Sequence, residues 1–360
     1  MHKSLCLLLP LLFASACTQP SDSSWDTVVD AGFRGRPGAE VAGVPCYPSL
    51  SQALAAAPAG DTPWRVLMRK GRYHEKVRVD RANLHLLGES REETILSFDA
   101  CGDTPAPDGT TLGTRGSATL TIQAPGFFAE RMTIENNFDY PANALRADTD
   151  PAKIAHSQAV AVMIAAGSDR TTFIDCVISG FQDTLFPDAG RALFSKCRIL
   201  GHVDFIFGAG QALFEACEIV SRDRPGKNPT GYITAPSTPA SYPYGFLFLD
   251  CRLLKETPEL PRGSVRLGRP WHPQGDLTVS GSAVFLHCWM DDHIGPEGYA
   301  AIGATDSSGR KLSFEIEPDS RFFEFGSHGP GTLASPARPR LTAEAAAWYT
   351  REQLLRGWKP

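Results

Sequence analysis

Two aspartates stand at the same place in two neighbouring copies of a short repeat. Asp183 follows Cys176 by seven residues, and Asp204 follows Cys197 by the same seven. If the two copies stack as neighbouring strands of a parallel sheet, their carboxylates lie about 5 Å apart. Two carboxylates this close cannot both ionise freely, so the pKa of one should rise unless a cation intervenes. Such a pair can divide acid and base work, one group attacking and the other donating a proton.

Positive and aromatic residues that could assist such a pair follow later in the chain. Arg224 stands seven residues beyond Cys217, at the matching place of the next copy, and Arg269 and Trp271 occur in the run Leu-Gly-Arg-Pro-Trp. An arginine paired with one aspartate would keep it ionised and oriented. A tryptophan offers a flat face on which a sugar ring can stack. The alternative is that each aspartate only caps a turn.

The repeat itself predicts the elements that position these residues. Five Phe-x-x-Cys segments form a series along the chain, and their cysteines are Cys176, Cys197, Cys217, Cys251 and Cys288. The first steps, of 21 and 20 residues, are near one coil of a solenoid, and the later steps of 34 and 37 fit one coil with an inserted loop. Short runs of Phe, Cys and aliphatic residues favour strands, with Cys and the aliphatic residue on one face. Their stacking predicts a parallel β-helix with ladders of like residues in its core.

The ladder cysteines are expected mainly to pack in the core, because a free cysteine behaves as a small hydrophobe. A disulfide is the alternative, since neighbouring rungs lie about 4.8 Å apart, within the Cα separation that a disulfide accepts. Cys197 and Cys217 are the first candidate pair. No C-x-x-C pair occurs and the histidines show no ligand spacing, so we expect neither a metal site nor a cofactor.

Both ends of the predicted solenoid carry helical sequence. Residues 49–57 predict a short helix, with Ser49 as a possible N-cap, that covers the open first coil. Residues 342–356 predict a second helix, packed along the outside near the other end. No Gly/Ser linker divides residues 25–360, so we expect one all-β domain there. The net charge of −5, with no long basic stripe, argues against a nucleic-acid partner but not against a polyanionic substrate.

The N-terminus has the pattern of a targeting segment. Lys3 precedes an apolar run at 5–13 that is too short to span a bilayer, and small residues follow at 14–16. We therefore expect a signal peptide at 1–16 and a polar tether at 17–24. Cys17 resembles a bacterial lipoprotein processing site, which favours lipid attachment at the outer membrane over release to the periplasm or beyond.

Five segments, in order, resemble those of the pectin methylesterase family. Its two signature segments resemble GFQDTL at 180–185 and GHVDFIFG at 201–208, and its other three resemble GRYHE at 71–75, QAVA at 158–161 and LGRPW at 267–271. GYITAPST at 231–238 is similar to the bacterial branch in particular. The resemblance covers roughly residues 25–355. It implies a single-stranded, right-handed parallel β-helix and hydrolysis of the methyl esters of galacturonan, as polymer or oligomer, by a monomer.

The same resemblance implies roles for individual residues. Asp204 resembles the nucleophile that forms a covalent anhydride, and Asp183 the acid that protonates methanol and then activates water. Gln182 and Gln158 resemble oxyanion-hole donors, and Arg269 resembles the residue that orients Asp204. Substrate contacts are implied for Trp271, Arg224, Thr114 and Phe207.

Three positions depart from the family pattern or from simple alternation. His202 stands where a small polar residue is common, and we assign it no catalytic role. Phe186 stands where tyrosine is usual. Alternation places Phe205 and Phe207 opposite Asp204, in the core, so Phe207 can meet a substrate only if the strand bends after Asp204.

Other functions remain possible at this point. A serine esterase would need a G-x-S-x-G elbow, which the sequence lacks. A β-helix pectate lyase would need calcium-binding acidic clusters and a basic catalyst, and a polygalacturonase would need paired acids without two glutamines beside them. A sugar-binding β-helix, or a surface lipoprotein that kept the fold without activity on pectin, is the non-enzymatic alternative.

Overall fold

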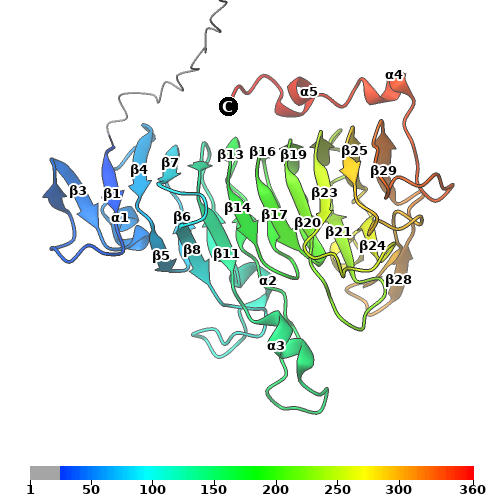
Figure 1. Ribbon diagram of the computed structural model, residues 1–360, viewed down its shortest axis with the longest axis horizontal. Helices are drawn as coiled ribbons and strands as arrows, with labels where there is room; N and C mark the ends of the chain where they lie inside the picture. Colours follow the sequence, from blue (N-terminus) through cyan, green and yellow to red (C-terminus); the bar gives the residue numbers. More distant parts are fainter. Residues whose placement is uncertain (1–24) are drawn as a thin grey trace, which may run out of the picture.

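The chain winds into a stack of coils, each contributing strands to three parallel sheets (Figure 1). The computed structural model describes residues 25–360, so the expected signal peptide and tether lie outside the described residues. The three sheets hold 12, 8 and 7 strands and are called sheets A, B and C. The fold is a single-stranded, right-handed parallel β-helix, which confirms the predicted class.

The strands of each sheet follow the chain in steps of one coil, except that residues 39–47 form an antiparallel pair of strands at the N-terminal edge of sheet A. Sheet A contains β1 Thr27–Val29, β2 Ala39–Val41, β3 Val44–Tyr47, β4 Trp64–Met68, β7 Leu84–Gly88, β10 Phe128–Glu130, β13 Thr171–Ile174, β16 Arg191–Ser195, β19 Gln211–Glu215, β22 Phe246–Leu249, β25 Gly281–Leu286 and β29 Ser320–Phe325. Sheet B contains β5 Gly71–His74, β8 Thr94–Phe98, β11 Thr133–Asn136, β14 Val177–Ser179, β17 Arg198–Gly201, β20 Glu218–Ser221, β23 Arg252–Lys255 and β26 Trp289–Met290. Sheet C contains β6 Val77–Val79, β9 Leu120–Ile122, β12 Val162–Ile164, β15 Leu185–Pro187, β18 Val203–Gly208, β21 Gly231–Pro236 and β24 Val265–Gly268.

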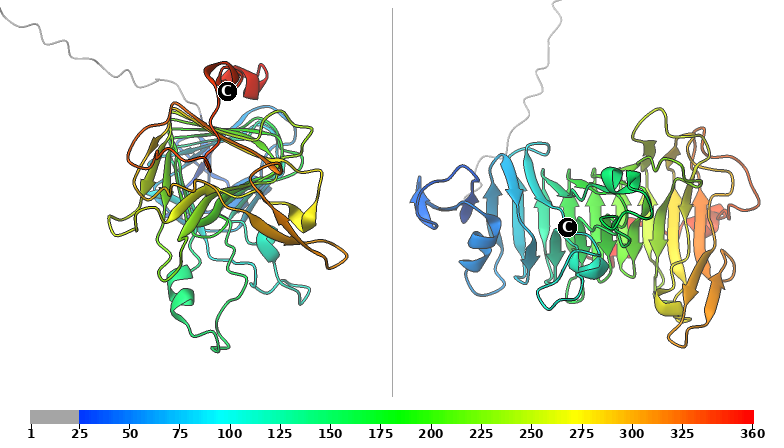
Figure 2. Two further views of the ribbon diagram at one scale, coloured as in Figure 1. Left: turned by 90° about the vertical axis from the view of Figure 1, so that its right-hand side faces the viewer. Right: turned by 90° about the horizontal axis from the view of Figure 1, so that it is seen from below.

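Short helices and one hairpin lie outside the sheets. The helices are α1 Leu50–Ala55, α2 Gly113–Gly116, α3 Tyr140–Leu145, α4 Ala343–Ala346, α5 Arg351–Leu355 and the 3-10 turn η1 Pro273–Gly275. Strands β27 Ile302–Thr305 and β28 Lys311–Phe314 form the hairpin. Helices α2 and α3 project from one side of the stack, and α4 and α5 lie on the opposite side (Figures 1 and 2). No helix among residues 25–360 is long and apolar enough to cross a membrane.

Each of the five Phe-x-x-Cys segments of the series is a corner rather than one strand, which corrects the simple alternation argument. Phe194 lies in β16 of sheet A, Lys196 has a φ of 54° and Cys197 leads into β17 of sheet B. The residue before each of the other four ladder cysteines also has a positive φ, at Asp175, Ala216, Asp250 and His287. The left-handed residue turns the chain by a sharp angle, so the phenylalanine and the cysteine both reach the core from different sheets.

Two ladders fill this core. The rings of Phe173, Phe194, Phe214, Phe248 and Phe285 stack from coil to coil, with centroids 5.2, 4.9, 4.5 and 4.5 Å apart. The five ladder cysteines are buried beside them. Burying such side chains provides the main favourable free energy of a solenoid, because each coil covers its neighbours.

The alternative of a disulfide between Cys197 and Cys217 is excluded, since both cysteines are free thiols. Each thiol instead donates to a carbonyl oxygen of the preceding coil. Cys197 Sγ lies 3.4 Å from Phe173 O, and Cys217 Sγ lies 3.2 Å from Phe194 O. The ladder cysteines therefore act as packing residues, as their main interpretation predicts.

Helix α1 closes the N-terminal end of the core. Ser49 is its N-cap and its hydroxyl accepts from the Gln52 amide at 3.3 Å, as predicted. The Glu75 carboxylate accepts from the amides of Leu50 and Ser51, each at 2.8 Å, and so provides a second cap from sheet B. Leu50 is fully buried against the first strands.

The C-terminal segment differs from the single helix predicted at 342–356. Two short helices, α4 and α5, replace it, and Thr342 and Thr350 cap them separately. The segment runs back over the outer face of sheet A (Figure 2). Leu354 and Leu355 are buried there among outward-facing side chains of that sheet, namely Leu193, Leu213, Leu247, Val284 and Leu286.

Candidate active site

The two predicted aspartates lie at equivalent places in adjacent coils, each just before or within a strand of sheet C. Asp183 precedes β15 with a φ of 62°, and Asp204 lies in β18 with a φ of 50°. The Asp183 amide donates to Val203 O at 3.1 Å, which holds one corner against the other. Left-handed conformations at non-glycine residues are strained and often occur at functional sites. Both carboxylates line one cleft of about 610 Å³.

Strand β18 bends directly after Asp204. Its register with β21 shifts between Val203 and Ile206, as in a β-bulge. Phe205 is therefore fully buried in the main core, whereas Phe207 packs outside it and lines the cleft. The bend required for Phe207 to meet a substrate is present.

Arg269 holds Asp204 with two hydrogen bonds. Its Nε donates to Asp204 Oδ1 at 2.8 Å, and its Nη2 donates to Oδ2 at 2.5 Å. The guanidinium also lies 4.1 Å from the ring centroid of Tyr232. A two-point contact of this kind stabilises the charged carboxylate and fixes its plane, as predicted for Arg269.

Asp183 has a different environment, although it shares the cleft. Its side chain is largely buried, and burial raises the pKa of Asp183 well above its usual value, as does the charge of Asp204. Arg269 and a hydrogen bond with Gln182 oppose this rise. The surroundings of Asp183 therefore favour its protonated form, as the spacing predicts for one member of such a pair, while Asp204 faces the two donors of Arg269.

Polar and aromatic side chains complete the cleft. Gln158 and Gln182 both line it, and Gln182 Oε1 accepts from the Ser157 hydroxyl at 3.5 Å, which leaves the amide N–H groups of Gln182 as donors. Trp271 packs edge-on against Phe207 with ring centroids 5.7 Å apart. Thr114, on α2, also lines the cleft. The sequence-predicted residues are thus brought together, with one exception.

Arg224 is the exception and does not share the cleft with the aspartates. It lies on the loop between β20 and β21 and lines a neighbouring hollow of about 610 Å³ with Tyr140, Lys153 and Lys227. The chain leaves the coil after β20, so counting seven residues from Cys217 no longer counts strand positions. The prediction of a matching register position was therefore wrong.

Comparisons with known proteins agree with this arrangement. The family description Pectinesterase matches residues 41–315. Pectinesterase A of Dickeya dadantii is 42% identical over 325 residues, which cover 87% of this chain and 88% of that protein.

The chain belongs to the pectinesterase family.

Solved structures of the family have the same fold. A pectin methylesterase from Erwinia chrysanthemi superposes with a TM-score of 0.88 at 39% identity, covering 94% of this chain and 99% of that one. A pectin methylesterase in complex with a hexasaccharide gives the same values. The enzyme from Yersinia enterocolitica has a TM-score of 0.82 at 41% identity, over 87% of this chain and 99% of its own.

This pectinesterase-family site also contains residues that the sequence reasoning missed. Arg222 connects the two aspartate-bearing corners, since its Nη1 donates to Gly180 O at 2.7 Å and its amide donates to Gly201 O at 2.8 Å. Its Nε donates to Glu256 at 3.1 Å, and its guanidinium lies 4.6 Å from the Phe181 ring centroid. Arg115 lines the cleft beside Thr114. No sequence signal marks either arginine, because their partners come from other coils.

His202 is buried behind the cleft. Its Nδ1 accepts from the Val203 amide at 2.7 Å, and its ring packs against Tyr140. Burial, with smaller effects of Arg224 and Arg222, lowers the pKa of His202 to about 3. A neutral ring that is bonded to the backbone fits the expectation that His202 has no catalytic role.

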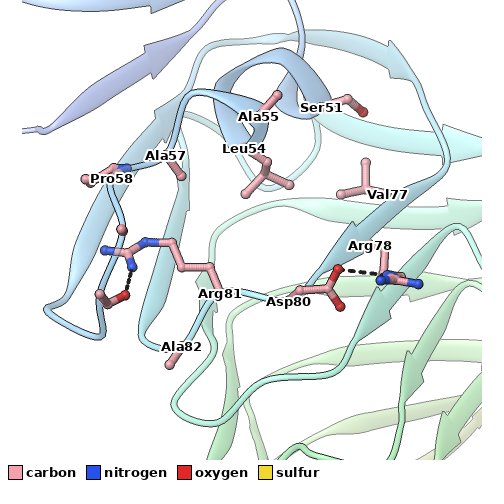
Figure 3. Close-up of a pocket in the computed structure, with 12 residues that line it drawn as sticks. Ser51, Leu54, Ala55, Ala57, Pro58, Val77, Arg78, Asp80, Arg81 and Ala82 are labelled. Atoms are coloured by element: carbon pink, nitrogen blue, oxygen red, sulfur yellow. Dashed lines mark hydrogen bonds and ion pairs between the residues drawn. The ribbon is translucent and has the colours of Figure 1, made fainter.

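A further hollow lies between α1 and β6, at the N-terminal end of the stack (Figure 3). Arg78 there donates from Nε to Asp80 Oδ2 at 2.8 Å, and Arg81 donates to the carbonyl of Thr62 at 2.8 Å. Asp80 supplies the one carboxylate among the described residues that line this hollow. No group of three or more His, Cys, Asp or Glu side chains within residues 25–360 is arranged to hold a metal ion.

Proposed function

We propose that this protein is a pectinesterase that hydrolyses the methyl esters of homogalacturonan to pectate and methanol, with Asp204 as nucleophile and Asp183 as acid and base. The observation that carries the proposal is the asymmetry of the two carboxylates. Asp204 accepts two hydrogen bonds from Arg269, while burial and a neighbouring charge favour the protonated form of Asp183 in the same cleft. An attacking group and a proton donor are thus available together.

The first half of the reaction uses both groups in these states. An Asp204 oxygen attacks the ester carbonyl carbon, and the carbonyl oxygen becomes an oxyanion. The side-chain N–H groups of Gln158 and Gln182 line the cleft where they can donate to this oxyanion. When the bond between the carbonyl carbon and the methoxy oxygen breaks, Asp183 gives its proton to that oxygen, which leaves as methanol. An anhydride then joins Asp204 to the galacturonate.

The second half restores the enzyme. Asp183 is now an ionised carboxylate in a buried place, which makes it a stronger base than an exposed aspartate. It removes a proton from water, and the resulting hydroxide attacks the galacturonate carbonyl. The bond to Asp204 breaks, so galacturonic acid leaves and loses its proton to solvent, Asp204 is ionised and Asp183 again carries the proton taken from water.

The cleft walls suit a sugar ester. Trp271, Phe207 and Phe186 form an apolar surface for ring faces and a methyl group. Thr114 contributes a hydroxyl at the opposite edge. We place Arg224 at a more distant contact, because it lines the neighbouring hollow with two lysines. The proposed enzyme acts as a monomer, without a metal or cofactor.

We further propose that the protein is exported and carries a lipid on Cys17. Support comes from the short apolar segment and the small residues that precede this cysteine. The test is incorporation of radiolabelled palmitate into the full chain, which Cys17→Ser should abolish. Equal labelling of both proteins would exclude this attachment site.

The test of the reaction is methanol release from highly methylated pectin. Asp204→Asn removes the nucleophile but keeps its shape, so methanol release should fall by roughly 10⁴-fold or more. Asp175→Asn, which removes a partner of Arg91 at 2.9 Å on another surface, is the matched control and should stay active. Full activity of Asp204→Asn would exclude the assigned nucleophile. Unsaturated or shortened chains from the wild type would indicate a lyase or a polygalacturonase, and binding without methanol release would indicate a binding protein.

A further inference from the structure

One cation in the cleft has no part in the reaction proposed above. Arg115 lies on α2, in the connection between β8 and β9, and lines the same cleft as the two aspartates. Arg115 and Arg269 are the two positively charged residues among those described that line it. Arg269 is occupied by Asp204, so Arg115 is the cation that remains for a ligand.

Arg115 is held in a defined orientation. Its Nη2 donates to Asp188 Oδ2 at 2.6 Å, and its guanidinium carbon lies 4.9 Å from the ring centroid of Phe186. Asp188 in turn accepts from the amide of Ala209 at 3.3 Å. The guanidinium is therefore fixed beside a residue of the cleft wall before a substrate arrives, which reduces the entropy lost on binding.

Most of the hydrogen-bonding capacity of Arg115 is unused. Its side chain is 60% exposed, compared with 16% for Asp188. Its Nε and Nη1 make no hydrogen bond within residues 25–360, while the planar group presents five N–H donors in all. Unused donors beside a substrate cleft suit an additional acceptor, above all a carboxylate, whose two oxygens match the guanidinium fork.

The reaction itself creates such an acceptor. Each methyl ester that is hydrolysed becomes a carboxylate, so the sugar next to an ester is either still neutral or negatively charged. We propose that Arg115 binds the free carboxylate of a galacturonate next to the ester being cleaved, and so makes the enzyme prefer partly de-esterified pectin. This proposal rests on the proposed function, of which it defines the substrate class.

The kinetic test compares two oligogalacturonides of equal length, one fully methylated and one with alternate free carboxylates. The wild type should have the higher kcat/KM on the second. Arg115→Gln should lower the ratio of the two values by roughly five- to tenfold, as expected for one partly exposed charge-assisted hydrogen bond. The change should lie in KM, because the contact is made before and during the reaction alike. The ratio for Arg115→Lys should lie between those of the wild type and Arg115→Gln, since lysine keeps the charge without the planar fork of the guanidinium.

Arg78→Gln is the matched control. Arg78 also faces outward from sheet C and pairs with an aspartate, but it lies on β6, three strands from β15 (Figure 3). Its substitution removes the same charge and should leave the ratio unchanged. An equal fall of the ratio in both variants would show a general field effect, and an unchanged ratio in Arg115→Gln would leave Arg115 with a structural role only. Either result overturns the proposal.

A binding measurement separates this proposal from the proposed function. Fully de-esterified oligogalacturonide is titrated into Asp204→Asn and into the double variant Asp204→Asn with Arg115→Gln. Weaker binding by the double variant supports the carboxylate contact even if no methanol is released by the wild type. Equal affinities contradict it. Absence of methanol release from every substrate would instead count against the proposed function alone.

Discussion

The two aspartates of the cleft have different surroundings, although they lie at equivalent places in adjacent coils. Asp204 has two hydrogen bonds from a guanidinium, while Asp183 has burial and a negatively charged neighbour. Removing a charged group from water costs free energy when it lacks a full partner. Burial therefore favours the protonated form of Asp183 and raises its pKa. The division of roles in the proposed reaction follows from this difference.

The raised pKa of Asp183 predicts how stability changes with pH. Below its usual value of 3.8 the group is protonated in both the folded and the unfolded chain and has no effect. Above that value the unfolded chain gains by ionising Asp183 while the folded chain does not. The group therefore reduces stability progressively as pH rises from the unfolded pKa toward the folded one.

Asp183→Asn removes this loss. We expect its thermal midpoint to exceed that of the wild type at about pH 8 and the difference to disappear below about pH 4. Calorimetry across this range checks the prediction, and methanol release should be lost at every pH. Asp175→Asn is again the control, because it removes a surface ion pair and should not stabilise the protein. A variant less stable than the wild type at alkaline pH would contradict the assignment.

At the scale of elements, the corners between sheets position the chemistry. Both aspartates of the proposed reaction have positive φ values, as do the residues before the five ladder cysteines. Backbone hydrogen bonds between coils hold these corners, and Arg222 adds two contacts that tie Gly180 to Gly201. We infer that Arg222 is a positioning residue, since it acts through the backbone of the corners rather than on the substrate.

Arg222→Ala should therefore lower kcat by roughly ten- to a hundredfold, because small misplacements of reacting groups are costly. The KM should change little, and circular dichroism should show the same fold. Arg222→Lys should recover part of kcat. Arg198→Ala removes a more exposed ion pair with Glu218 from the neighbouring strand and should leave kcat unchanged. Equal loss in both variants, or a loss seen only in KM, would argue against a positioning role.

At the scale of the whole molecule, the C-terminal segment covers one side of the stack, while α2, α3 and the β27–β28 hairpin lie on other sides (Figure 1). Its leucines fill the surface of sheet A, and Arg191 donates to Leu355 O at 2.6 Å. This segment stabilises the solenoid by covering apolar side chains that alternate outward from its strands. No residue of 342–360 is among the described residues that line the cleft.

Leu354 tests this separation of stability from chemistry. It is fully buried, so Leu354→Ala should lower the free energy of unfolding by about 2–5 kcal/mol. Denaturant unfolding measures this loss, and kcat per folded molecule should stay the same. Leu333→Ala, at a half-exposed leucine, should have little effect on either quantity. A fall in the kcat of Leu354→Ala at denaturant concentrations below its unfolding transition would show that the segment also supports the site.

The coil period and the pairing of Asp183 with Asp204 could be predicted from the sequence alone. Each coil of a β-helix uses a nearly constant number of residues, so equal spacing in the chain becomes a short distance in space. The N-cap of α1 could be predicted for a similar reason, because Ser49 acts within its own turn. In both cases the interaction is local or repeats with a fixed period.

Only the tertiary structure decided where that period fails. The loop after β20 carried Arg224 out of the cleft, and Arg269 came to Asp204 from the end of β24, two coils further along the chain. The contacts of Arg115, Arg222 and the C-terminal leucines join residues from different coils, and no spacing in the chain encodes them. Inserted loops have no fixed length, so the packing of whole coils, rather than the order of residues, determines which side chains meet.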